Sequence, residues 1–176
     1  MGRTRMTEPI DLTPYLGHES PPVEFPDGLI GFPEWTRFVL CSHPAGGALY
    51  LLQSLDDERL SLIVTDPARV LPGYRITMAE ADARAIGYSG PLTIEEPWPA
   101  GLGVYCVLSV CNEPFRVTAN LLGPLVINLA TGQGRQLVIA ESGYDSRHPV
   151  AGHPSEGSNS EPAVVADPNR GGGARC

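Results

Sequence analysis

Residues 118–128, Thr-Ala-Asn-Leu-Leu-Gly-Pro-Leu-Val-Ile-Asn, decide the fold. The stretch is apolar at its centre and carries an amide near each end, at Asn120 and Asn128. Its central Gly-Pro pair is unfavourable inside a strand, because proline has no N–H for a ladder and glycine has no side chain to pack. We therefore predict a strand, a tight corner and a second apolar strand over 125–129, with both amides satisfying backbone groups of a buried corner. The alternative interpretation of this corner is a recognition surface.

The rest of the chain alternates turn-forming residues with short apolar runs. The 176 residues include 20 Gly and 18 Pro, which favours many turns and a β-rich chain. One short helix is predicted over 78–85, with Thr77 as its N-cap and Glu80 completing a capping box. These signals predict a mostly β fold: a small antiparallel, β-barrel-like single domain with one short helix. Strands are expected at 37–41, 48–53, 60–64, 74–76, 92–95, 103–110 and 136–141.

The two ends of the chain differ in composition from its middle. Residues 1–21 carry scattered charges and prolines, and we expect a flexible N-terminal arm. Residues 22–150 are expected to form the β domain. Residues 151–176 are rich in Gly, Pro, Ser and Asn, with Val164-Val165 as their one apolar pair, so we expect a disordered C-terminal tail.

Charge excludes several classes of function. The net charge is −8, and all 12 cationic residues are arginine. Nucleic-acid binding depends on neutralising phosphates, so an acidic chain argues against it and favours a basic protein partner. Without lysine there is no P-loop lysine and no Schiff base. The acidic turn Asp56, Asp57 and Glu58 is interpreted as solvated charge, or as a surface that steers a basic partner.

The cysteines do not form a metal or redox motif. The N-terminus has no apolar signal segment, so we expect a cytoplasmic protein with reduced thiols and no membrane span. Cys41 and His43 lack further ligands nearby in sequence, and Cys106 is interpreted as a small core residue. We expect no metal, no cofactor and no enzymatic activity. The alternative is a small-molecule-binding β-barrel with thiol-dependent activity at Cys106 or at the Cys41/His43 pair.

Residues 24–35, Glu-Phe-Pro-Asp-Gly-Leu-Ile-Gly-Phe-Pro-Glu-Trp, combine a turn with large apolar groups. Proline presets φ, aspartate bonds its own backbone and glycine accepts positive φ, so 26–28 is predicted to be a turn. Exposed apolar side chains would form an adhesive patch. We therefore expect this loop to pack on the core through Leu29, Ile30, Phe32 and Trp35.

Several short stretches, taken in order, resemble one bacterial family, the flagellar assembly factor FliW. The resemblance covers about residues 22–150, and the Gly123 position, more often Ala in the family, is a minor departure. No single motif is specific alone, whereas their order and spacing together are. The stretches are Phe25-Pro-Asp-Gly-Leu-Ile-Gly-Phe32, Leu52-Gln-Ser54, Val64-Thr-Asp-Pro67 followed by Tyr74, residues 118–128, and Arg135-Gln136 followed by Tyr144 and Arg147.

The resemblance implies a non-catalytic, barrel-like domain with two protein partners. One is flagellin, and the other is the carbon storage regulator CsrA, a small RNA-binding dimer that represses flagellin translation. It implies that the protein keeps CsrA off flagellin messenger RNA until accumulating flagellin competes for it. In such a partner switch the two partners weaken each other's binding. We expect a monomer.

The resemblance assigns two groups of residues. Glycines, prolines and buried amides are what barrel corners need, so the first group is interpreted as structural: Gly28, Gly31, Gln53, Asp66, Pro124 and Gln136. The second group is the predicted partner-binding set: Phe32, Asn120, Leu121 and Asn128, with Asp56, Asp57 and Glu58 steering a basic partner.

Overall fold

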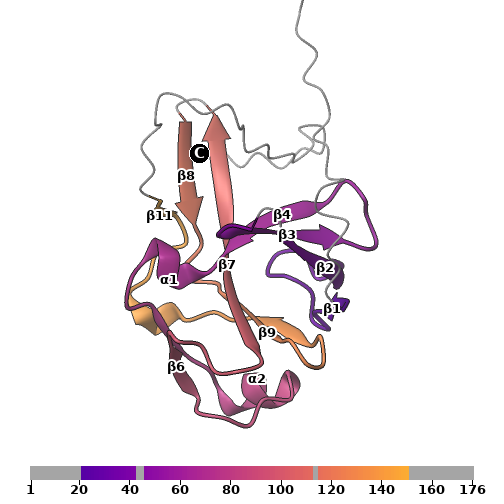
Figure 1. Cartoon of the computed structure of the whole chain (residues 1–176), viewed down its shortest axis with the longest axis vertical. Coiled ribbons are helices and arrows are strands. Elements are labelled where there is room, and N and C mark those ends of the chain that lie inside the picture. The colour runs from indigo at the N-terminus through magenta and orange to yellow at the C-terminus, as the bar shows by residue number, and fades with distance from the viewer. Residues whose placement is uncertain (1–20, 43–45, 113–114, 151–176) are drawn as a thin grey trace, which may run out of the picture.

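The computed structural model describes residues 21–42, 46–112 and 115–150, and this part of the chain is mostly β (Figure 1). Residues 1–20 of the predicted arm, the predicted tail and His43 lie outside it. Two short helices, α1 (Pro67–Val70) and α2 (Glu80–Ala85), and a 3-10 turn, η2 (Ala140–Ser142), interrupt the strands. The strands are β1 (Val23–Glu24), β2 (Arg37–Ser42), β3 (Leu49–Ser54), β4 (Ser61–Thr65), β5 (Arg75–Thr77), β6 (Thr93–Glu95), β7 (Leu102–Asn112), β8 (Phe115–Ala119), β9 (Leu125–Asn128), β10 (Gly134–Gln136) and β11 (His148–Pro149).

Strand β7 is the axis of the fold, and Figure 1 shows it running almost the full height of the described structure. Its first four residues pair with β9 and its last five with β8. Because β8 and β9 follow each other in sequence and both run antiparallel to β7, they occupy the same edge of it in succession. Strand β4 pairs with β7 at Cys106 and Val107.

The predicted corner separates β8 from β9. Ala119 lies opposite Leu108, and Leu125 lies opposite Tyr105. Five residues, 120–124, therefore lie opposite only two residues of β7, Cys106 and Val107. The chain loops away from β7 here and returns, which explains the Gly-Pro pair. The prediction is confirmed, with the second strand ending at Asn128.

The strands around β7 close into a ring. The order β1-β2-β3-β4-β7-β9-β10 is completed by a bridge between Glu24 and Gln133, beside a hydrogen bond from Glu24 N to Gly132 O of 2.8 Å. The predicted antiparallel, barrel-like fold is thus confirmed. The ring is filled by apolar side chains, including Phe25, Phe38, Leu40, Leu52, Val64, Leu125 and Ile127.

A second core lies on the other side of β7 and β9. Side chains of successive strand residues point to opposite faces. Tyr105 and Val107 accordingly pack against the ring core, whereas Val104 and Cys106 belong to the second core. The β5–β6 pair, α2 and the corner cover this second core, which includes Tyr74, Ile76, Met78, Ile86, Ile94 and Leu121.

Helix positions were predicted only in part. The helix near 78–85 exists, but it starts at Glu80 with Ala79 at the N-cap and no side-chain cap. Thr77 is instead the last residue of β5, and its hydroxyl bonds the hydroxyl of Thr93 on β6 at 2.9 Å. The prediction of a capping box is therefore wrong, because Thr77 pairs within β5 and its hydroxyl is bonded to Thr93. Helix α1 was not predicted; Asp66 caps it and proline occupies its first turn.

The last predicted strand, 136–141, is also wrong. Strand β10 ends at Gln136, and η2 begins at Ala140. Between them, Leu137 N bonds Pro124 O at 2.8 Å and Ile139 N bonds Leu122 O at 3.1 Å. Backbone groups of the corner thus take the donors that a ladder would have used.

The loop over 25–35 packs on the core less completely than expected. Leu29 is buried, but Ile30 is 54% exposed and Phe32 is 44% exposed. Leu29 and Phe32 exchange backbone hydrogen bonds of 3.1 and 2.8 Å, so Ile30 and Gly31 form the tip of a two-residue hairpin. A hairpin tip points away from its strands, and the expectation for Ile30 and Phe32 was wrong.

Two glycines of this loop provide a test of its backbone. Gly28 and Gly31 both have positive φ, +68° and +85°. A Cβ at Gly28 would lie 2.4 Å from Pro33 O, whereas a Cβ at Gly31 would meet nothing within 4 Å. Gly31→Ala should cost roughly 1–2 kcal/mol of unfolding free energy, the left-handed backbone penalty. Gly28→Ala should cost clearly more in urea unfolding, and equal losses would contradict this packing.

The second core provides another test. The Tyr74 hydroxyl donates to Leu121 O at 2.6 Å in a fully buried site, and burial raises the pKa of Tyr74 above its ordinary value. Tyr74→Phe leaves that carbonyl without this donor and should lower the unfolding free energy by about 1–3 kcal/mol. In the matched control, Tyr144→Phe, water replaces the exposed bond to Arg75 N, and the loss should stay within about 0.5 kcal/mol. A Tyr74→Phe protein as stable as the control would refute the role of this bond.

Candidate functional site

The side-chain amides of Asn120 and Asn128 both form hydrogen bonds with backbone groups. Asn120 Oδ1 accepts from Gly123 N at 2.9 Å and so closes the corner. Asn128 Nδ2 donates to Ile86 O at 3.0 Å, at the end of α2, and its Oδ1 accepts from Ala130 N at 3.1 Å. Asn120 thus serves the corner as predicted, whereas the prediction that Asn128 also satisfies the corner is wrong, because its partners lie at the end of α2 and after β9. Their role in partner binding stays a prediction.

Leu121 cannot lie on a partner-facing surface in this fold. Its side chain is fully buried in the second core, its N–H bonds Asp145 O at 3.0 Å, and its carbonyl accepts from Tyr74. The corner directs this leucine inward, where it packs in the second core with Val104 and Cys106 of β7. The prediction that Leu121 contacts a partner is therefore corrected.

Gln136 joins the corner to the exposed loop. Its Oε1 accepts from Ile30 N at 2.8 Å, and its Nε2 donates to Gly123 O at 3.1 Å. A single side chain thus binds the hairpin tip and the corner, which lie 93 residues apart in sequence, as the numbers of Ile30 and Gly123 show. The structural interpretation of Gln136 agrees with these contacts.

Arg135 joins the same loop to α2. It forms an ion pair with Asp27 in the turn before the hairpin, and its Nε lies 2.6 Å from Asp82 Oδ1 on α2. Arg135 was not among the predicted site residues. The available signal was its position next to Gln136, since neighbouring strand residues can fix elements on both sides of a strand.

These contacts hold a partly apolar surface, which we call the loop surface and define as Ile30, Phe32 and the hollow beside them. Phe32 stacks on Trp35 with ring centroids 3.8 Å apart and an angle of 5°. The hollow has a volume of about 320 Å³ and is lined by residues 27–31, 134–136, Phe25 and Pro33. Exposed apolar groups on a fixed backbone need little ordering on binding, which favours a protein contact.

Gln53 and Asp66 stabilise turns elsewhere. Gln53 Nε2 donates to Glu58 O at 3.1 Å and Leu60 O at 3.0 Å, which fixes the acidic turn. Asp66 Oδ1 accepts from Ala68 N at 2.9 Å as the cap of α1, and from Trp98 Nε1 at 3.1 Å. Both contacts support the structural interpretation.

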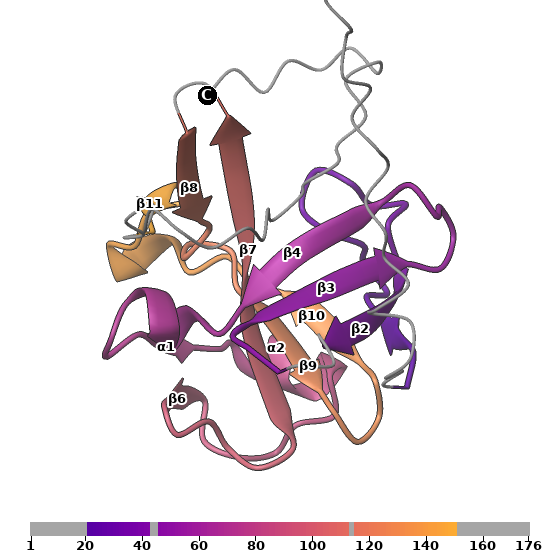
Figure 2. The same cartoon turned by 45° about the horizontal axis from the view of Figure 1, so that its top comes forward.

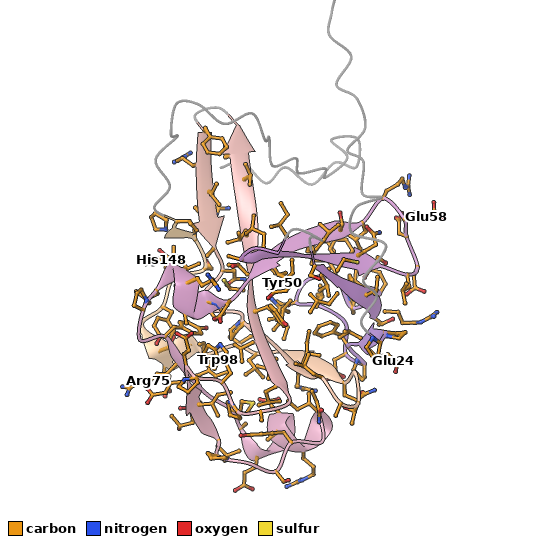
Figure 3. The ribbon with its side chains drawn as sticks, viewed as in Figure 1. Glu24, Tyr50, Glu58, Arg75, Trp98 and His148 are labelled. Atoms are coloured by element: carbon orange, nitrogen blue, oxygen red, sulfur yellow. The ribbon has the colours of Figure 1, made fainter. Side chains whose placement is uncertain are left out.

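The acidic turn is partly neutralised by its neighbours. Figure 3 shows Glu58 at the outer edge of the molecule, away from β7. Asp56 lies 3.3 Å from Arg37, and Asp57 lies 3.1 Å from Arg59. Three carboxylates beside two guanidinium groups leave this region with far less charge than the sequence indicated. Steering by Asp56, Asp57 and Glu58 stays a prediction, and the net charge of the whole chain becomes its stronger basis.

The two cysteines of the alternative prediction lie in the interior. Cys106 and Cys41 are fully buried. Burial, with the Asp66 carboxylate second, raises the pKa of Cys106 to about 12 despite a backbone hydrogen bond that lowers it, so its thiol stays protonated near neutral pH. Apolar side chains fill the ring interior. A ligand-binding barrel, the alternative prediction, needs a cavity there, so this filling argues against it. Within the described ranges, no group of three or more His, Cys, Asp or Glu residues could hold a metal ion.

Among the described residues, no helix has both the length and the apolar character needed to span a membrane. A crystal structure of the flagellar assembly factor FliW has the same fold, with a TM-score of 0.64 and 26% identity, covering 78% of this chain and 90% of that chain. FliW of Bacillus subtilis (strain 168) is 30% identical over 73% of this chain and 84% of its own length.

Further relatives of the chain are also FliW proteins. The flagellar assembly factor FliW of Geotalea uraniireducens is 32% identical over 72% of each chain. FliW 2 of Desulfotalea psychrophila is 27% identical over 72% of this chain and 78% of its own. The sequence model of the family described as "FliW protein" matches residues 13–150. The resemblance seen in the sequence is confirmed, and the chain belongs to the FliW family.

Proposed function

We propose that this protein is a cytoplasmic flagellar assembly factor that works by binding other proteins and without catalysis. Its membership of the FliW family carries the proposal, since the relatives named above are called flagellar assembly factors. The burial of Cys41 and Cys106, the raised pKa of Cys106 and the filled ring also support binding over chemistry.

The proposed partners are flagellin and a CsrA-type translational regulator. Bound regulator is kept from flagellin messenger RNA, so flagellin is translated. Free flagellin then competes for the protein, the regulator is released, and translation stops. Reciprocal weakening of the two partners is the thermodynamic requirement of this switch.

We place the contact for at least one partner at the loop surface. Ile30 and Phe32 are large, apolar and exposed, whereas Gln136, Arg135 and the Phe32–Trp35 stack fix their backbone and orientation. Binding energy concentrates in a few well-held apolar anchors of this kind. Gln136 bonds Ile30 N directly, and Asn120 bonds the backbone of Gly123, to which Gln136 is also bonded.

The first test is direct binding. The purified protein should form complexes with flagellin and with the CsrA-type regulator of the same bacterium at micromolar concentration, by calorimetry or co-purification. Each partner should displace the other. If neither partner binds, the proposed function is overturned. If both bind at the same time without weakening each other, only the switch is overturned.

The loop surface has its own test. Ile30→Ser and Phe32→Ala should each weaken binding of a partner by roughly 5- to 30-fold, as expected for anchor residues worth about 1–2 kcal/mol. Phe115→Ala is the matched control, because Phe115 is 58% exposed at the start of β8 and belongs to neither the loop nor the corner. Thermal unfolding separates lost binding from lost folding. If Ile30→Ser and Phe32→Ala bind the partners as tightly as Phe115→Ala does, the loop surface is not part of the interface.

A further inference from the structure

The loop surface carries more unbalanced negative charge than the acidic turn does. The three carboxylates of the acidic turn have two arginines as neighbours, which leaves one negative charge. Residues 24–35 and 134–136, which include the lining of the hollow, carry one arginine and three carboxylates: Arg135, Glu24, Asp27 and Glu34. One positive and three negative charges give a balance of −2. A surface of this sign attracts cations.

Arg135 does not offset the charge of the carboxylates around it. It forms the ion pair with Asp27, and its Nε lies 2.6 Å from Asp82 Oδ1. Figure 2 shows its strand, β10, beside β9, and α2 is tied to this strand by the contact with Asp82. One guanidinium thus serves two carboxylates. Because one positive charge cannot balance both, a negative charge remains beside the hollow.

Asp27 is the carboxylate best placed to meet another molecule. It lines the hollow, and its side chain is 69% exposed, whereas the side chain of Asp82 is 27% exposed. A carboxylate has two oxygens and accepts several hydrogen bonds. Arg135 Nη1 donates to Asp27 Oδ2, so Oδ1 can accept from a donor outside the chain.

The walls of the hollow suit an aliphatic stem. Phe25, Leu29, Ile30 and Pro33 line it, and its volume is about 320 Å³. This volume is at the small end of the range for small-molecule sites, about 300–1,000 Å³, and therefore suits a single side chain. Lysine and arginine lay their methylene stems along apolar surface and keep the charged head among polar groups.

We propose that the hollow receives one lysine or arginine side chain of a protein partner, with its stem on the apolar walls and its charged head at Asp27. The proposal rests on the proposed function, because it takes the loop surface as a protein contact. The chain has no lysine, and Arg135 is engaged within the site, so the cation comes from another molecule. The matching partner segment carries a basic residue beside apolar residues that meet Ile30 and Phe32.

Asp27 also makes the site selective among side chains. An acidic side chain in the hollow would meet Asp27 as a like charge, which disfavours the complex. A neutral side chain would remove water from Asp27 and Arg135 without replacing its hydrogen bonds, which costs free energy. A long cationic side chain avoids both costs.

Asp27→Asn tests the proposal, because asparagine keeps the size of the side chain and an acceptor for Arg135 but removes the charge. The partner to measure is flagellin or the CsrA-type regulator, whichever loses affinity with Ile30→Ser. At about 0.05 M salt, Asp27→Asn should weaken that complex roughly 5- to 20-fold, as expected for a close charge pair at an interface. At about 0.5 M salt the difference should shrink to about 2-fold or less, because salt screens the contact in the unchanged protein.

Glu58→Gln is the matched control. It removes the same charge from the acidic turn, at the outer edge of the molecule (Figure 3). Its affinity for the partner should stay within about 2-fold of the unchanged protein at both salt concentrations, as expected for an exposed charge outside the contact. Asp27→Glu keeps the carboxylate and should restore the salt dependence that Asp27→Asn loses.

Three outcomes would overturn the proposal and leave the proposed function intact. The first is an unchanged affinity of Asp27→Asn. The second is an equal loss for Asp27→Asn and Glu58→Gln, which is an effect of net charge. The third is a loss of the same size at both salt concentrations, which indicates altered loop structure.

The earlier variants separate this proposal from the ones it rests on. If Ile30→Ser and Phe32→Ala weaken neither complex, the loop surface is not a contact and the proposal for Asp27 is overturned with it. If the unchanged protein binds neither partner, the proposed function is overturned as well.

Discussion

Every part of this fold depends on the sharing of β7 between two cores. One edge of β7 holds β8 and β9 in succession, and its two faces serve the ring core and the second core. A single straight partner strand would give one flat sheet. Five corner residues opposite two residues of β7 break the partner, so β9 can follow the ring while β8 leaves it. The corner is thus the condition for closing the ring.

Such a corner leaves backbone groups without ladder partners, and side-chain amides supply them. Asn120 and Gln136 bond the two backbone groups of Gly123, and Asn128 bonds the end of α2. Gln136 also bonds Ile30, so the same amide that satisfies the corner fixes an exposed apolar hairpin tip. Structure and binding are therefore coupled here: the corner residues position the loop surface that we propose as the contact.

Local chemistry explains which predictions held. Turns signalled by proline, aspartate and glycine, the corner, and most strands of the ring follow from residues close in sequence. The cap at Thr77 and the strand over 136–141 failed because partners distant in sequence competed for the same groups. Thr93 takes the Thr77 hydroxyl, and the corner carbonyls take the donors of Leu137 and Ile139. Sequence spacing cannot reveal such competition.

The sequence by itself determined the fold class, the family resemblance, the corner, and the acidic, lysine-free character of the chain. The tertiary structure alone decided which apolar residues remain exposed. Leu121 and Ile30 are equally apolar in sequence, yet the first is fully buried and the second is exposed. The corner turns Leu121 toward β7, whereas the hairpin tip turns Ile30 outward. Burial depends on where the backbone points each side chain, and distant contacts such as those of Gln136 set that direction.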